Sequence, residues 1–194
     1  KLILKKFKIP IPKSLITNKK DILRDYKKIG FPLVAKINSN TVFHKTEING
    51  VITDINNEKE LKQKTKNFKG SILLEKMIKN GVYEIIIGIK IDNDFGPIIV
   101  LGAGGIYTEL FKDTATLLLP LNKKIILEEL KKLKFGKILF GFRGKKSADL
   151  DALVKVILKI AKFAENNSDK ISEIDINPLI VCKKDKGVFA VDAL

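Results

Sequence analysis

Apolar and polar positions along the chain follow two different periods. Amphipathic helices space their apolar residues three and four apart, whereas strands show alternating or short continuous apolar runs. Helical spacing occupies residues 1–7, 18–29, 57–68, 125–133 and 148–165. Strand patterns occupy residues 31–37, 51–55, 71–78, 82–90, 98–101, 116–121, 172–182 and 188–191. The pattern predicts a protein of the mixed α/β class, with helices and strands interspersed.

Polar residues at the ends of the helical segments predict where the helices begin and end. Thr17 or Asn18 can cap the helix at 18–29, and Gly30 can end it. Asn122 and Ser147 are the predicted caps of the helices at 125–133 and 148–165.

One side of the last strand pair carries polar and acidic residues. Strict alternation places Glu173, Asp175 and Asn177 on one side of the strand that begins at residue 172. The tract at 183–187 predicts a hairpin loop, so the returning strand would bring Asp192 near Asn177. A carboxylate and an amide oxygen at a strand end suit Mg²⁺, which takes few protein ligands. The pattern fits equally an exposed edge hairpin with a solvated polar face.

Isolated charged residues inside apolar strands suggest further chemistry. Lys36 needs a partner or an exit to solvent, and either a nucleotide phosphate or the open face of an edge strand would provide one. Glu75 and Glu84 can contact a ribose, an adenine edge or a cation, or can be ordinary edge carboxylates. His44, the only histidine, lies in a predicted loop at 38–50. An imidazole there can accept a phosphoryl group or can be a plain surface residue.

The glycine-rich tract at 102–105 follows a strand and permits close approach of the backbone to a ligand or to another segment. Its spacing matches neither a dinucleotide-binding fingerprint nor a P-loop. By itself the tract therefore identifies no ligand.

Composition limits the cellular setting. The 194 residues, 45% of them hydrophobic, can bury one good core or two small ones. No apolar run approaches the roughly 20 residues that cross a bilayer, and the first residues lack the pattern of a signal peptide. Cys182 is the single cysteine, which excludes an internal disulfide and a cysteine-based metal site. We expect a cytoplasmic protein without a membrane partner.

The net charge of +15 raises the question of nucleic-acid binding. Arg24 and Arg143 are the only arginines, whereas base recognition and bidentate phosphate recognition favour arginine. The lysines are spread along the chain, and no basic strand interleaved with aromatic residues is visible. The sequence therefore indicates a solvated lysine coat and no nucleic-acid partner.

The order of the short motifs is more specific than any one motif. The motifs are IPIP at 9–12, GFPLVAKI at 30–37, HKT at 44–46, NGV at 49–51, FGP at 95–97, GAGGI at 102–106, GFRG at 141–144, DINPL at 175–179 and VDA at 191–193. Together they resemble the ATP-grasp subunit or domain of NDP-forming acyl-CoA synthetases. The beta subunit of ADP-forming acetyl-CoA synthetase typifies this family, and the beta subunit of succinyl-CoA synthetase is a more distant member.

The resemblance implies a fold and a reaction. The fold would be an α/β (α+β) ATP-grasp fold, with a smaller lobe at 1–74, a larger lobe at 75–194 and the nucleotide cleft between them. The enzyme would be an acid–thiol ligase that converts acyl-CoA, ADP and phosphate into a free acid, ATP and CoA through a phosphohistidine. It would use ATP or ADP with Mg²⁺ and would need a CoA-binding alpha subunit as partner. The alternative is a non-catalytic or regulatory nucleotide-binding module.

The resemblance also implies which residues bind the nucleotide. Lys36 would hold its phosphates. Glu75, together with the backbone near Met77, would bind adenine and ribose. Glu84 would lie close to the ribose or the phosphates.

The remaining implied roles concern the metal and the phosphoryl group. Asn177 and Asp192 would ligate Mg²⁺. His44 matches the histidine of a mobile loop that takes the phosphoryl group to the nucleotide, and Asp175 would orient a histidine during transfer.

Overall fold

The computed structural model describes residues 2–38, 50–105 and 113–193, and these form two compact units. The smaller unit is Pro12–Lys79, and the larger unit combines Lys1–Ile11 with Asn80–Leu194. The division expected after residue 74 falls inside strand β4 (Ile72–Lys76), which pairs with two other strands of the smaller unit. The first eleven residues belong to the larger unit, because Leu4 and Ile9 are buried in its core.

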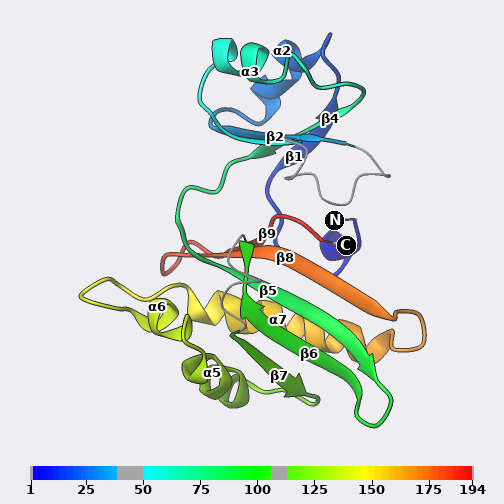
Figure 1. Ribbon diagram of the computed structural model, residues 1–194, viewed down its shortest axis with the longest axis vertical. Helices are drawn as coiled ribbons and strands as arrows, with labels where there is room; N and C mark the ends of the chain where they lie inside the picture. The colour runs from blue at the N-terminus through cyan, green and yellow to red at the C-terminus, as the bar shows by residue number, and fades with distance from the viewer. Residues whose placement is uncertain (1, 39–49, 106–112, 194) are drawn as a thin grey trace. The chain divides into compact units, whose positions relative to one another are not determined.

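The smaller unit is a four-stranded antiparallel sheet with helices on one face. The strands β1 (Ser14–Thr17), β2 (Leu33–Ile37), β3 (Val51–Ile55) and β4 follow the order β1-β4-β2-β3. The helical segments are α2 (Ile22–Asp25), η1 (Tyr26–Lys28) and α3 (Glu58–Lys64). Ile22 of α2 and Leu61 of α3 pack with Leu33 and Ile72 in one apolar core. Both helices therefore cover the same face of the sheet (Figure 1).

The helix predicted at 18–29 is wrong in its first part. Thr17 ends strand β1, and helical structure begins only at Ile22. The side chain of Asn18 accepts hydrogen bonds from the backbone N–H groups of Lys20 and Asp21, at 2.9 and 3.1 Å, and so forms a turn. The predicted end at Gly30, which has a φ of +77°, is confirmed.

Asp25 joins this turn region to β1. Its carboxylate accepts a hydrogen bond from the Thr17 hydroxyl at 2.8 Å and contacts Arg24 and Lys28 at 3.2 and 3.0 Å. The Thr17 hydrogen bond, followed by those from Arg24 and Lys28, lowers the pKa of Asp25 from 3.8 to about 2.

We therefore expect Asp25→Asn to lower the free energy of unfolding at pH 7. A depressed carboxyl pKa stabilises the fold above the ordinary value of 3.8, and this stabilisation is lost as the pH falls toward 2. Urea unfolding of both proteins across this range should show two curves that converge at low pH. A difference that stays constant down to pH 2 would contradict the assignment.

The larger unit is a five-stranded antiparallel sheet. The strands β5 (Gly81–Asp92), β6 (Gly96–Ala103), β7 (Thr114–Leu118), β8 (Glu173–Cys182) and β9 (Val188–Ala190) follow the order β7-β6-β5-β8-β9. The helices are α1 (Leu2–Lys6), α5 (Lys123–Lys132), α6 (Gly136–Phe140) and α7 (Leu150–Asn166). Figure 1 shows α7 running across one face of the sheet, where Leu153 and Ile157 pack in the same core as Ile85 and Ile87 of β5.

The predicted N-cap is confirmed for α5 but is wrong for α7. Asn122 caps α5 as predicted, accepting a hydrogen bond from the N–H of Ile125 at 3.0 Å. Asp149, and not Ser147, caps α7 through the N–H of Ala152. The Asp149 carboxylate also accepts from the N–H of Gly187 at 2.8 Å, a tertiary contact that local sequence does not reveal.

Helix α6 was not predicted, because its single turn offers too few positions for a helical period.

Among the described residues, no helix is both long and apolar enough to cross a membrane.

Candidate functional site

Strand β8 carries the predicted polar face. Ile176, which is 1% exposed, lies in the apolar core, Ile174 packs against that core, and Glu173 is exposed. Asp175 and Asn177 are half-buried on the face opposite the core. The alternation predicted for residues 173–177 is confirmed.

A β-bulge ends this face at Asn177. The register of β5 against β8 moves from Ile87 opposite Ile176 to Ile85 opposite Leu179. One residue of β5 therefore faces two residues of β8, Asn177 and Pro178. Such a bulge reorients side chains locally and is common next to active sites. It allows Ile176 and Leu179 to enter the same core while Asn177 stays on the other face.

Asn177 lies opposite Asp192, as predicted from the hairpin. The backbone N–H of Asn177 donates to the carbonyl oxygen of Asp192 at 3.2 Å, and Val191 N–H donates to the Pro178 carbonyl at 3.0 Å. The pairing of β8 with β9 thus continues past the end of β9. Directly opposed residues of an antiparallel pair project from the same face. The carboxylate of Asp192 accepts from the N–H of Ala193 at 3.0 Å.

Two glycines connect Asn177 to Glu84 of β5. The N–H of Gly105 donates to the side-chain oxygen of Asn177 at 3.0 Å, and the N–H of Gly104 donates to the Glu84 carbonyl at 2.9 Å. Gly105 has a φ of +67°, and a Cβ at this position would lie 2.2 Å from Oε2 of Glu84. The positive φ favours glycine at this position, and a Cβ would also force the Glu84 carboxyl group to move. Sequence reasoning identified no ligand for these glycines, and a glycine pair directly after a strand was their only signal.

Two carboxyl groups in this region, those of Asp175 and Glu84, have raised pKa values. Burial raises the pKa of Asp175, the nearby Glu173 raises it further, and Lys90 opposes the effect. The pKa of Glu84 is also raised, because its carboxyl group is partly desolvated by burial although the residue as a whole remains exposed.

The oxygen atoms of Asn177 and Asp192 fit a hard divalent cation. Among the described residues, no group of three or more His, Cys, Asp or Glu side chains could enclose a metal ion. The pair therefore suits an ion that completes its shell with water and phosphate oxygens, as Mg²⁺ does. The Gly105 N–H occupies one acceptor direction of the Asn177 oxygen, and an amide oxygen has two.

In the smaller unit, Lys36 and Glu75 form a buried ion pair. Their side chains approach to 2.8 Å, and the two residues are 4% and 1% exposed. Lys36 of β2 lies opposite Leu73 of β4, two residues from Glu75, so the pair shares the face away from the apolar core. The edge-strand alternative is wrong for both, since β2 and β4 are interior strands. It is also wrong for Glu84, because β5 lies between β6 and β8.

Met77 directly follows β4. Its backbone N–H donates to the Pro32 carbonyl at 3.1 Å, which fixes the chain where it leaves the sheet. The side chain of Lys76 donates to the carbonyls of Gly30 and Phe31 beside it. His44 lies outside the described residues.

The predicted site residues thus fall into two groups. Lys36, Glu75 and Met77 belong to the smaller unit, whereas Glu84, Asp175, Asn177 and Asp192 belong to the larger unit. Within the larger unit, the structure brings Glu84 and Asn177 together through Gly105, and it places Asp192 opposite Asn177.

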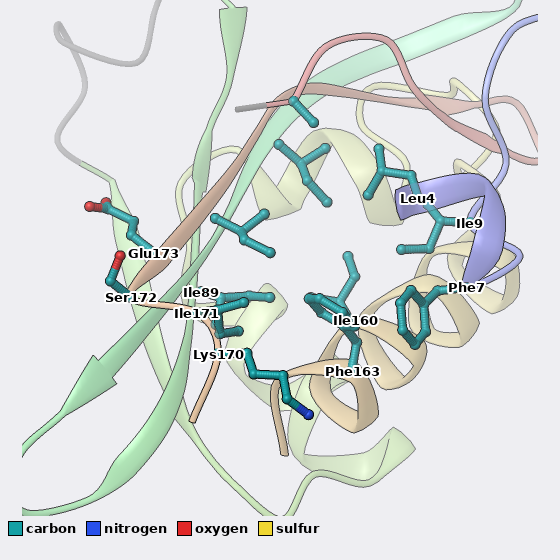
Figure 2. A pocket seen from close by; sticks show the side chains of 13 residues that line it. Leu4, Phe7, Ile9, Ile89, Ile160, Phe163, Lys170, Ile171, Ser172 and Glu173 are labelled. Carbon is teal, nitrogen blue, oxygen red and sulfur yellow. The ribbon is translucent and has the colours of Figure 1, made fainter. Parts of the chain in front are cut away.

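An apolar cavity of about 340 Å³ lies on the other side of β8 (Figure 2). Its lining includes Phe7, Ile160 and Phe163. The two phenylalanine rings pack edge to face, with their centroids 4.3 Å apart. Ile176 belongs to its wall, so the cavity opens on the core face of the strand. Glu173, at the start of the polar face, also lines it, whereas Asp175 and Asn177 do not.

Comparison with known proteins agrees with this arrangement. A family model described as an ATP-grasp domain matches residues 1–194. The beta subunit of acetate–CoA ligase [ADP-forming] II from Pyrococcus furiosus is 32% identical over 100% of this chain and 87% of that subunit. A 4-hydroxybutyrate–CoA ligase [ADP-forming] from Nitrosopumilus maritimus is 35% identical over 98% of this chain, which spans 29% of that ligase.

A solved structure shows the same fold. It is acetyl-coenzyme A synthetase 1 of Ca. Korarchaeum cryptofilum in complex with coenzyme A, Ca-AMPCP and HgCl⁺. It matches with a TM-score of 0.86 and 30% identity over 99% of this chain and 88% of that chain. The fold and the resemblance predicted from the motifs are confirmed. The chain belongs to the ATP-grasp family and, within it, to the family of the beta subunits of ADP-forming acetate–CoA ligases.

Proposed function

We propose that this chain is the nucleotide-binding subunit of an ADP-forming acetyl-CoA or acyl-CoA synthetase. The reaction converts acyl-CoA, ADP and phosphate into a free acid, ATP and CoA, and this chain transfers the phosphoryl group between a phosphohistidine and ADP. The observation that carries the proposal is the pairing of Asn177 with Asp192 beside the Gly105 amide. It offers hard oxygen ligands next to a backbone N–H group, an arrangement suited to a magnesium-bound phosphate chain.

Asn177 and Asp192 would hold Mg²⁺, which supplies charge neutralisation at the phosphates when bound. Glu84 would lie close to the ribose or the phosphates, where its contact with Gly105 keeps the side chain in place. Fixed ligands of this kind contribute by positioning, which is most of what phosphoryl transfer asks of a protein.

Lys36, Glu75 and Met77 would bind the nucleotide from the smaller unit. Lysine is a compact point charge suited to phosphate, and its ion pair with Glu75 at 2.8 Å defines its position. Glu75 and the backbone near Met77 would contact the adenine and the ribose. The hydrogen bond from Met77 to Pro32 holds that backbone in place.

His44 would carry the phosphoryl group, and Asp175 would orient the imidazole by accepting a hydrogen bond from its N–H. In the transfer, the P–N bond of phosphohistidine breaks while a terminal phosphate oxygen of ADP forms the new P–O bond. The imidazole leaves as a neutral base once its other nitrogen holds the proton. The carrier thereby separates acyl chemistry from nucleotide chemistry.

The Pyrococcus relatives are beta subunits, and this supports a multi-subunit enzyme. We propose a CoA-binding alpha subunit as the partner that performs the acyl chemistry, and we place the enzyme in the cytoplasm, where ADP and acyl-CoA are available. The names of the relatives favour this catalytic function over a regulatory module.

The test combines turnover with binding. The chain and its alpha subunit should form ATP from ADP, phosphate and acetyl-CoA. His44→Ala should lose ATP formation completely but bind Mg²⁺-ADP with unchanged affinity in a calorimetric titration. Full activity in this variant would refute the histidine relay, and nucleotide binding without turnover in the unaltered complex would favour the regulatory alternative.

A further inference from the structure

A second concave surface of the larger unit is strongly basic. It has a volume of about 880 Å³ and is formed mainly by the segment between α6 and α7 and by the turn between β8 and β9. No acidic residue is among the described residues that line it. We call it the basic pocket, and its cationic residues are Arg143, Lys145, Lys146, Lys183, Lys184 and Lys186.

Backbone contacts hold the two basic segments against each other. Ala148 forms a β-bridge with Lys183, and the N–H of Asp149 donates to the Cys182 carbonyl at 2.9 Å. The Asp149 carboxylate accepts from the N–H of Gly187 at 2.8 Å. Because these bonds tie both segments to the start of α7, the two basic segments cannot separate without breaking them.

Within the described part of the chain, the cationic groups of the basic pocket form no ion pair with a carboxylate, although the charge of Lys184 acts on Asp151 at longer range. All six residues are exposed, and none lies within ion-pair distance of a described Asp or Glu. Other surface lysines do have such partners, for example Lys123 with Asp151 at 2.6 Å. Like charges held together repel one another, so this surface has excess positive potential that an anion would relieve.

The basic pocket also has an apolar part. Val82, Ile138 and Phe142 line it, and Phe142 is 48% exposed. The guanidinium of Arg143 lies 5.3 Å from the centre of the Phe142 ring. Arg143 has a φ of +48°, a conformation that L-residues rarely adopt. A charged group and an accessible aromatic ring are thus held side by side.

We propose that the basic pocket is a second anion site, which binds a chain of phosphates such as that of a nucleoside polyphosphate or of inorganic polyphosphate. Its volume lies in the range of small-molecule sites. Five of the six cations are lysines, which are depleted at protein interfaces but bind phosphate as point charges. Single-stranded nucleic acid would require several stacking aromatic residues along a groove, and Phe142 is the only aromatic residue among the described residues that line the pocket.

This site is separate from the proposed nucleotide site. Lys183 follows Asn177 by six residues along an extended strand, which corresponds to about 20 Å. Loss of one site should therefore leave the other intact. The two proposals can fail independently.

The experiment is a titration of the complete chain with inorganic tripolyphosphate, without Mg²⁺, at low and at moderate salt. Lys183→Gln/Lys184→Gln/Lys186→Gln should weaken binding at least tenfold and lower the slope of log affinity against log salt by about three. The matched control is Lys59→Gln/Lys62→Gln/Lys69→Gln, which removes the same charge from exposed positions of the smaller unit. The control should change affinity less than twofold, and both variants should retain Mg²⁺-ADP binding.

Three results would overturn the proposal. They are no tripolyphosphate binding by the unaltered chain, equal weakening in both triple variants, and binding of polyglutamate at the basic pocket as tight as that of tripolyphosphate. Two further arms distinguish the phosphate sources. If metal-free ADP binds more tightly than tripolyphosphate and this difference disappears in Phe142→Ala, the ligand is a nucleotide whose base stacks on the ring. If the two affinities are equal, the site recognises the phosphate chain alone.

Discussion

Replacing Lys36 with methionine is expected to lower the free energy of unfolding of the smaller unit by about 3–5 kcal/mol. The substitution would leave the Glu75 carboxylate, now 1% exposed and 2.8 Å from the lysine, without its cation. A charge that has lost its partner in a buried position is strongly destabilising, whereas an intact buried pair adds little net stability. Urea unfolding monitored by circular dichroism measures the change.

The double variant Lys36→Met/Glu75→Gln separates structure from function. Removing both charges should restore most of the stability, because no isolated charge remains. Binding of Mg²⁺-ADP should still be lost if Lys36 holds phosphate. Recovery of both properties would show that the pair is structural only. Lys64→Met is the matched control, since its exposed pair with Glu60 at 3.4 Å should contribute less than about 1 kcal/mol.

The strands and the family could be predicted from sequence because their signals are local or collinear. Alternation alone identified Glu173, Asp175 and Asn177 as one face of β8. The bulge at Asn177 could not be predicted, because it depends on the register against β5. The Asp149 cap was missed for a similar reason, since its carboxylate also binds the N–H of Gly187, which lies in a distant turn.

The clustering of the lysines could not be predicted from the sequence and became visible only in the fold. Along the sequence, the lysines look like an evenly spread coat. In the structure, the bridge from Ala148 to Lys183 brings two distant basic segments together. The interpretation of Lys36 also changed, because β2 lies between two other strands and is not an edge strand. The order of the strands within the sheet decides this, and the residues of β2 alone do not reveal it.

Replacing Gly104 with alanine is expected to abolish both Mg²⁺-ADP binding and ATP formation. A Cβ at Gly104 would lie 2.4 Å from the carbonyl carbon of Ile85 and 2.7 Å from its oxygen. Both atoms are backbone of β5, an interior strand that cannot move aside. The glycine segment would have to shift, breaking its 2.9 Å bond to Glu84 and withdrawing the Gly105 N–H from Asn177.

Overpacking of this kind costs about 1–3 kcal/mol, so Gly104→Ala should remain folded and its binding can be measured by calorimetry. Gly88→Ala is the matched control, at a glycine within β5 itself. Its Cβ would find Val100 at an ordinary 3.7 Å, so stability and binding should stay close to those of the unaltered chain. If Gly104→Ala lost stability but bound Mg²⁺-ADP normally, the glycine segment would not position Asn177, and the metal site would have to be formed without the Gly105 amide.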